Sequence, residues 1–208
     1  MATDTAKRVR EFGPDSAGTI MTPREFDRAQ FAEGWRYELI RGVLVVSPIP
    51  LENERDSNGE LGHILRTYRD THPQGSSLDA TLFEHTVRTG QNRRRADRVI
   101  WAGLGRRPRK GEVPTIVTDF VSAGKRDRQR DYEEKRDEYL AAGVREYWVI
   151  DRFKRTLTVF TRHGRKVRKR LVRESQTYTP NLLPGFELPL PRLFAVADSW
   201  PEAEPGAE

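Results

Sequence analysis

The chain has 208 residues, of which 36% are hydrophobic and 33% charged, and its formal net charge is +6. This length suits one packed domain, and four Trp, six Tyr and nine Phe argue against a disordered chain. The absence of Cys excludes disulfide frameworks and Cys-ligated metal sites. No apolar run is long enough to span a bilayer, so we expect a cytoplasmic protein without a membrane partner. The excess of Lys and Arg over Asp and Glu favours a polyanionic partner.

The first part of the chain is expected to hold a flexible lead-in, a short helix and a hairpin. Residues 1–20 mix charges with Gly, Pro and Ser, and they lack the apolar core of a signal peptide. Thr22 suits a helix N-cap and Pro23 suits the first helical position. Alternating apolar residues on both sides of Arg41 and Gly42 then predict a β-hairpin.

The rest of the chain predicts helices and strands in alternation. Apolar residues at i, i+3, i+4 and i+7 predict a helix over 52–72, and a second helix over 128–142 ends at Gly143. The apolar, proline-rich tail is expected to pack back on the body, and 199–208 to be disordered. We predict one α/β domain over 21–198, an α+β mixed sheet flanked by helices. The predicted strands are 80–88, 96–103, 115–121, 145–151, 156–162 and 166–173.

Two acidic residues stand in apolar strands near the middle of the chain, Asp97 in ADRVIWAG and Asp119 in TIVTDFV. If these strands are neighbours, the two carboxylates can share a divalent cation, since hard cations such as Mg²⁺ prefer carboxylate oxygens. Such a cation assists phosphodiester hydrolysis by polarising the phosphoryl oxygen and activating water. The alternative is structural, because either acid can cap a turn or pair with an arginine. Asp97 has Arg95 and Arg98 close by in the chain.

Lys135 lies on the next predicted helix and shares a face with Tyr132 and Tyr139. A lysine on an inward face can orient water or stabilise developing charge. Alternatively, it extends past the tyrosines or pairs with Asp131 at i, i+4, and spacing alone favours this simpler interpretation. Tyr139 is expected to fill the core, with a bond to the lysine as the alternative.

Four stretches of the sequence follow one another in the order of a known family. They are RYELIRGVLVVSPIP, ADRVIWAG, the run from TIVTDF to YWVID, and LLPGFELPLPRLF. Together they resemble the Uma2 family, which looks like a branch of the PD-(D/E)XK, restriction-endonuclease-like superfamily. The resemblance covers roughly 21–196. The residues that match its hairpin, helix and strand motifs are Tyr37, Glu38, Leu39, Gly42, Asp131, Lys135, Tyr139, Gly143, Val144, Glu146, Tyr147, Trp148 and Asp151.

The resemblance implies a restriction-endonuclease-like core with metal-binding acids on central strands. It also implies an endonuclease that needs Mg²⁺ or Mn²⁺ and hydrolyses DNA phosphodiester bonds. Asp97 takes the first acid position, Asp119 the second, and Ser122 the serine that follows. The lysine of a standard (D/E)XK motif falls at Val121, so Lys135 is expected to reach the site from its helix.

Glu38 is implied as a further metal ligand. Its equal alternative is a strand-surface carboxylate paired with Arg36 or Arg41. Ala96 replaces the usual proline and Asp119 the usual glutamate, and an active site is sensitive to displacements of about 1 Å. These departures keep a second hypothesis open, a catalytically inactive nuclease-fold protein that binds nucleic acid or a protein partner.

Basic residues are the candidates for contact with nucleic acid. They are Arg93, Arg94, Arg95 and Lys125, and the alternative is a solvated surface. No base-reading motif is present, so the sequence does not indicate which bases are recognised. RNA is therefore an alternative to DNA as the substrate. A homodimer is considered because cutting both strands of a duplex often uses two copies.

Overall fold

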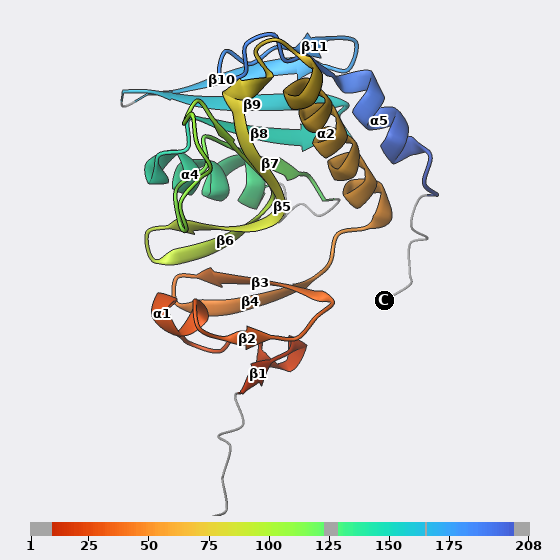
Figure 1. Cartoon of the computed structure of the whole chain (residues 1–208). Helices are drawn as coiled ribbons and strands as arrows, with labels where there is room; N and C mark the ends of the chain where they lie inside the picture. The colour runs from red at the N-terminus through yellow and green to blue at the C-terminus, as the bar shows by residue number, and fades with distance from the viewer. Residues whose placement is uncertain (1–9, 123–128, 165, 202–208) are drawn as a thin grey trace, which may run out of the picture.

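The structure is a computed structural model that describes residues 10–122, 129–164 and 166–201. An eight-stranded mixed sheet runs through it, with helices on both faces (Figure 1). Its strands are β3 (Trp35–Ile40), β4 (Val43–Pro48), β5 (Leu78–Thr89), β6 (Asn92–Ala102), β7 (Ile116–Phe120), β8 (Glu146–Asp151), β9 (Thr156–His163) and β10 (Lys166–Arg173). The other elements are β1 (Glu11–Phe12), β2 (Gln30–Phe31), β11 (Thr177–Tyr178), β12 (Leu188–Pro189), α1 (Pro23–Phe26), α2 (Glu52–Thr71), α4 (Arg136–Ala142), α5 (Leu190–Asp198), the 3-10 helices η1 (Pro14–Ser16) and η2 (Gly75–Ser77), and the π-helix η3 (Arg130–Lys135).

The strand order is β10-β9-β8-β7-β6-β3-β4, and β5 pairs with β6 as a long hairpin. Only β7 and β8 are parallel among the strand pairs of this sheet in the described residues. Their connection passes over the sheet and contains η3 and α4, as a parallel crossover requires. The predicted mixed sheet flanked by helices is confirmed.

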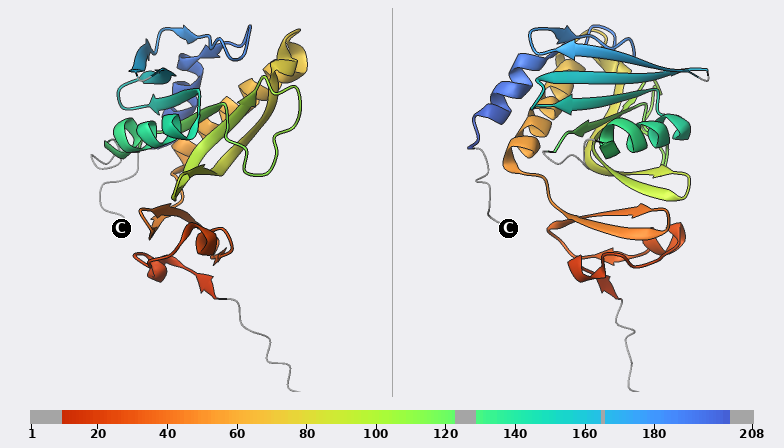
Figure 2. Two further views of the ribbon diagram at one scale, coloured as in Figure 1. Left: turned by 90° about the vertical axis from the view of Figure 1, so that its left-hand side faces the viewer. Right: turned by 180° about the vertical axis from the view of Figure 1, so that it is seen from behind.

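Two apolar layers hold the sheet between its helices. On one face, α2 and α5 lie side by side and bury Leu61, Leu65 and Phe194 against the sheet (Figure 2). On the other face, α4 buries Tyr139 against Tyr147 of β8. The sheet is therefore covered on both sides at β7 and β8, which explains why their side chains are almost all buried.

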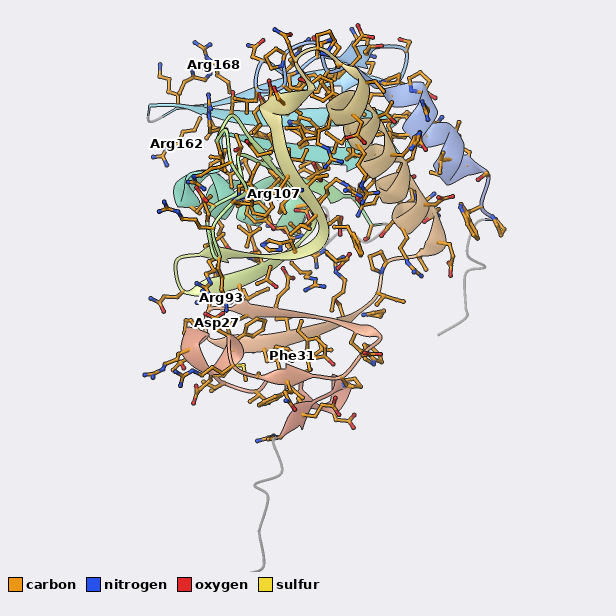
Figure 3. The ribbon with its side chains drawn as sticks, in the orientation of Figure 1. Asp27, Phe31, Arg93, Arg107, Arg162 and Arg168 are labelled. Atoms are coloured by element: carbon orange, nitrogen blue, oxygen red, sulfur yellow. The ribbon has the colours of Figure 1, made fainter. Side chains whose placement is uncertain are left out.

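The N-terminal elements β1, β2 and α1 form a small layer below the β3–β4 edge of the large sheet in Figure 1. The predicted helix start is confirmed, because Thr22 and Glu25 form a reciprocal capping box at α1. The predicted hairpin is confirmed too, since Arg41 and Gly42 both have positive φ, 52° and 81°, as a type I′ turn requires. An ion pair between Asp27 and Arg93 ties this layer to β6 (Figure 3).

Several segments differ from the sequence-based expectation. Residues 1–20 were predicted as a flexible lead-in, but their described part pairs with β2 through β1 and bonds to β4 through Gly18 N and Leu44 O at 2.8 Å. The tail, for which no element was predicted, contains α5. In the tail predicted to be disordered, Trp200 donates a hydrogen bond from Nε1 to Asp56 Oδ2 at 2.9 Å. None of the helices in the described ranges is long and apolar enough to cross a membrane.

Candidate active site

Asp97 and Asp119 lie next to each other on β6 and β7. The pairing of these strands ends at Arg98 and Thr118, one residue short of the two acids. Beyond it, Asp97 N donates to Asp119 Oδ1 at 3.2 Å, and Phe120 N donates to Asp97 Oδ2 at 2.7 Å. The side chains of the two acids thus take the place of backbone partners where the ladder stops, which brings two buried carboxylates together.

Lys135 reaches these acids from η3. Its Nζ lies 3.1 Å from Asp119 Oδ1 and 3.4 Å from Asp131 Oδ1, and its side chain is 4% exposed. Burial by itself would lower the pKa of Lys135, but Asp119 and Asp131 together raise it. The lysine is therefore a permanently charged group at neutral pH. Tyr147 OH donates to the other oxygen of Asp119 at 2.9 Å and completes its set of partners.

The cation on Asp97 comes from β3. Arg36 Nη2 lies 2.8 Å from Asp97 Oδ1, and its Nε lies 3.3 Å from Glu84 Oε2. The sequence had offered Arg95 and Arg98 as partners of Asp97, but neither forms this ion pair. Glu84 lies on β5 between the residues that pair with Arg98 and Ala96, and it adopts a left-handed backbone with φ 48°, a conformation uncommon outside glycine. This local kink accompanies the turn of Glu84 towards Arg36.

Glu54 is a buried acid at this site that the sequence analysis missed. It lies in the first turns of α2 and is 8% exposed. Burial and the nearby charge of Asp97 raise the pKa of Glu54 to about 7, although a hydrogen bond with Ser122 works in the opposite direction. Burial likewise raises the pKa of Asp97 to about 6, against the attraction of Arg36. The two carboxyl groups therefore lie close enough to repel one another.

A signal for Glu54 was present in the sequence. Glu54, Asn58, Leu61 and Leu65 repeat at helical spacing, so the apolar face of the predicted helix continues backwards to Glu54. An acid on the buried face of a helix is unusual unless it has a partner or a task.

An open groove of about 710 Å³ gives access to Asp97. It is lined by residues of β3, α2, β5 and β6, among them Arg36, Glu54 and Asp97. Asp119 and Lys135 are not among its lining residues in the described structure, so they form a second, buried row behind Asp97. A substrate in this groove would meet Asp97 and Glu54 first.

The other predicted site residues take different places. Glu38 is 6% exposed, and its Oε1 accepts a hydrogen bond from Arg95 N at 2.9 Å. It is thus neither a surface carboxylate nor, among the described contacts, an ion-pair partner of Arg36 or Arg41. Tyr139 is fully buried, and its hydroxyl has no hydrogen-bond partner within the described residues. Ser122 bonds to Glu54.

Two of the arginines predicted to contact nucleic acid are used inside the protein. Arg93 is bound to both carboxylate oxygens of Asp27, at 2.7 and 3.0 Å. Arg94 is 0% exposed and forms two hydrogen bonds to Glu138. Their guanidinium groups are not on the surface, because β6 begins earlier than predicted and turns them towards neighbouring elements. Arg95 does line the groove.

Lys125, the remaining predicted contact, lies outside the described residues.

The acids of the groove fit a hard divalent cation in their donor chemistry. Mg²⁺ commonly takes one or two carboxylates from a protein and completes its shell with water and substrate oxygens. Asp97 and Glu54 supply two such donors at the same wall. Within the described ranges, no three His, Asp or Glu side chains are grouped to hold an ion by themselves. A bound cation would thus depend on water and substrate for the rest of its shell.

Comparisons with known proteins support the family and the fold. A family model described as "Putative restriction endonuclease" matches residues 23–191. Among solved structures, the chain is similar to the crystal structure of a "putative nuclease belonging to DUF820" from Anabaena variabilis ATCC 29413. The TM-score is 0.66 and the identity 15%, over 85% of this chain and 99% of the other. At this identity the similarity shows the fold alone. No match was found among the curated proteins.

Proposed function

Because the chain belongs to the Uma2 family, we propose that it is an endonuclease that hydrolyses DNA phosphodiester bonds with a divalent cation, Mg²⁺ or Mn²⁺. The observation that carries this proposal is the cluster of Asp97, Asp119 and Lys135, in which Asp97 lines an open groove and the other two residues lie buried behind it. Clusters of buried ionisable groups with shifted pKa values are typical of functional sites. Here they come from three separate elements, so no single helix or hairpin accounts for the cluster.

Asp97 is the central cation ligand in this proposal. Glu54 would reach the cation from α2, Asp119 would hold it from behind, and Glu38 would support it through water. When bound, such a cation polarises the phosphoryl oxygen and lowers the pKa of a bound water. Arg36 pairs with both Asp97 and Glu84 in the structure, so it is placed to keep Glu84 and turn its other donors to a substrate phosphate when the cation binds.

Lys135 would hold the carboxylate of Asp119 in place. Its ammonium group is held by two carboxylates and also contacts the carbonyl oxygen of Arg95, at 3.4 Å. A fixed positive charge at this depth stabilises negative charge that develops on the phosphate and needs no rearrangement during the reaction. Tyr147 and Tyr139 would exclude water from this side.

The second candidate is an inactive nuclease fold that binds nucleic acid or a protein. The observation that favours it is that both central acids already have cationic partners within the chain, Arg36 for Asp97 and Lys135 for Asp119. A site that is neutralised internally has less need of a metal ion.

Cleavage of supercoiled plasmid and of single-stranded DNA and RNA separates the two candidates. The protein is incubated with each substrate and with Mg²⁺, Mn²⁺ or EDTA. Asp97→Asn and Lys135→Met are tested beside Asp70→Ala, an exposed acid on α2 away from the groove. We expect cation-dependent nicking of DNA that both site variants lose and the control keeps. If the protein cleaved both DNA and RNA, the proposed substrate would widen to both nucleic acids, and the proposed phosphodiester hydrolysis would stand.

Failure to cut under every condition, with salt-sensitive binding retained in both site variants, would refute the nuclease proposal in favour of the second candidate. Circular dichroism of each variant distinguishes loss of chemistry from loss of folding. Sedimentation at the assay concentration tests the proposed homodimer, with a single-chain mass as the contrary result.

A further inference from the structure

Among the described residues, Arg98 is a buried cation without an acidic partner. It follows Asp97 on β6 and is 2% exposed. Its Nε and Nη2 donate to Asn58 Oδ1 and Asn58 O at 2.7 and 2.6 Å, and its Nη1 donates to Thr81 Oγ1 at 3.2 Å. All these partners are neutral. Arg94, equally buried on the same strand, instead lies 2.6 Å from Glu138. A buried charge is costly without a counter-charge, so Arg98 stands out.

A second cation lies beside it. Arg66 projects from α2, is exposed, and forms no ion pair among the described residues. Arg66 lies one turn after Gly62 on α2, where the Arg98 guanidinium packs, and both arginines line the same groove. Asp97 attracts Arg98 but is bound to Arg36. Two like charges thus share one part of the groove wall without a local anion between them.

Gly62 of α2 lets the Arg98 guanidinium pack directly against this helix. A Cβ atom on residue 62 would lie 2.5 Å from Arg98 Nη2, so only glycine leaves room for the guanidinium against α2. Asn58 holds Arg98 on one side and donates to Asp97 O at 2.8 Å on the other. The cation is therefore fixed relative to Asp97 through a single side chain.

An aromatic side chain stands at the same point of the groove. Phe83 is the cross-strand partner of Arg98 on β5 and is 64% exposed. Exposed aromatic rings next to cations are the usual platform for nucleic-acid bases in strand-binding grooves. Phe83, Arg66 and Arg98 all line the groove that contains Asp97.

We propose that Arg98 and Arg66 form an anion subsite that binds a backbone phosphate of a nucleic-acid strand, next to the phosphate at Asp97, while Phe83 stacks on a base. This inference rests on the proposed function and adds to it: the groove binds an unpaired strand, because a base inside a duplex does not present its face to Phe83. Arg98 and Arg66 are positioning residues, and the reaction itself takes place at Asp97.

Fluorescence anisotropy with a labelled single-stranded oligonucleotide in EDTA tests the subsite without cleavage. Arg66→Ala is compared with Arg168→Ala, an exposed arginine on β10 at the far edge of the sheet (Figure 3). Arg66→Ala is expected to weaken binding about tenfold and to reduce the slope of log K against log salt by about 0.7, one phosphate contact on a single strand. Arg168→Ala is expected to change neither.

Phe83→Ala and Arg98→Lys complete the set. Loss of stacking is expected to weaken single-strand binding at least about fivefold, and duplex binding less. Arg98→Lys keeps the positive charge but loses the planar guanidinium with its fixed donors. Its affinity for the single strand is therefore expected to lie between those of wild type and Arg66→Ala. Thermal unfolding of the variant checks that it is folded. Inorganic phosphate is titrated as a competitor. If it displaces the oligonucleotide at an equal concentration of phosphate groups, the subsite binds free phosphate and the strand assignment fails.

Two results would overturn the subsite. One is an equal loss of oligonucleotide affinity in Arg66→Ala and Arg168→Ala, and the other is no binding of the oligonucleotide by wild type at low salt. Cleavage is measured separately with Mg²⁺. An intact subsite in a protein that never cuts DNA contradicts only the proposed function. Cutting with the same KM in Arg66→Ala and Arg168→Ala contradicts only the subsite.

Discussion

Replacing Glu54 by Gln should stabilise the protein at high pH and leave it unchanged at low pH. Burial and the charge of Asp97 raise the pKa of Glu54 from its ordinary value of 4.5 to about 7. The folded protein thus holds this proton more tightly than the unfolded chain. The contribution of protonated Glu54 to the free energy of unfolding is fully present below pH 4.5 and is lost as the pH rises through 7. A neutral amide does not ionise and avoids this loss.

The magnitude follows from the shift. Two and a half pH units at about 1.4 kcal/mol each amount to about 3.5 kcal/mol at pH 8. For a domain of this size, about 2–4 °C of Tm per kcal/mol gives a difference of roughly 7–14 °C. At pH 4.5 the expected difference is close to zero.

Differential scanning calorimetry in EDTA at pH 4.5, 6, 7 and 8 measures this difference. Glu52→Gln, an exposed acid at the start of the same helix, serves as the control and should follow wild type at every pH. A constant offset between Glu54→Gln and wild type across the series would refute the reasoning, because it would reflect packing and not ionisation. Adding Mg²⁺ at pH 8 should raise the wild-type Tm more than that of Glu54→Gln.

Three further substitutions test other parts of the structure. Lys135→Met should cost about 3–5 kcal/mol of unfolding free energy in urea, because it leaves Asp119 without its buried cation; an unchanged midpoint would mean the pair is solvated. Gly62→Ala should cost about 1–3 kcal/mol by forcing Arg98 away from α2, and Gly59→Ala, whose added Cβ has only an ordinary contact with Asp56, is the control. Thr22→Ala should cost about 1 kcal/mol by removing the cap of α1, whereas Thr22→Ser should restore stability.

The sequence predicted much of the fold because the relevant signals are local. The turn at Arg41 and Gly42 follows from the backbone that a two-residue hairpin needs. Gly143 was predicted to end a helix, and it does so with φ 104°. The strand over 166–173 coincides with β10. By contrast, α5 was missed because prolines interrupt its start, and only its burial against α2 reveals the helix.

The helix that carries Lys135 shows how tertiary contacts override simple periodicity. Spacing predicted a face of Tyr132, Lys135 and Tyr139. Because the helix begins as the π-helix η3, the buried face consists of Asp131, Lys135 and Tyr139, whereas Tyr132 is only half-buried. A change of helical pitch of this kind is common at functional sites. It depends on what the segment packs against, which the sequence does not state.

By itself, the sequence determined the family, the order of the elements, and Asp97, Asp119 and Lys135 as the residues to examine. Only the tertiary structure decided which charges meet. Arg36 lies on Asp97 instead of its chain neighbours, Arg93 and Arg94 turn inward to acids from other elements, and Glu54 joins the site from a helix far away in the chain. Local patterns record which face of an element is buried. Partners across the sheet depend on register and packing, and these arise only when the whole chain has folded.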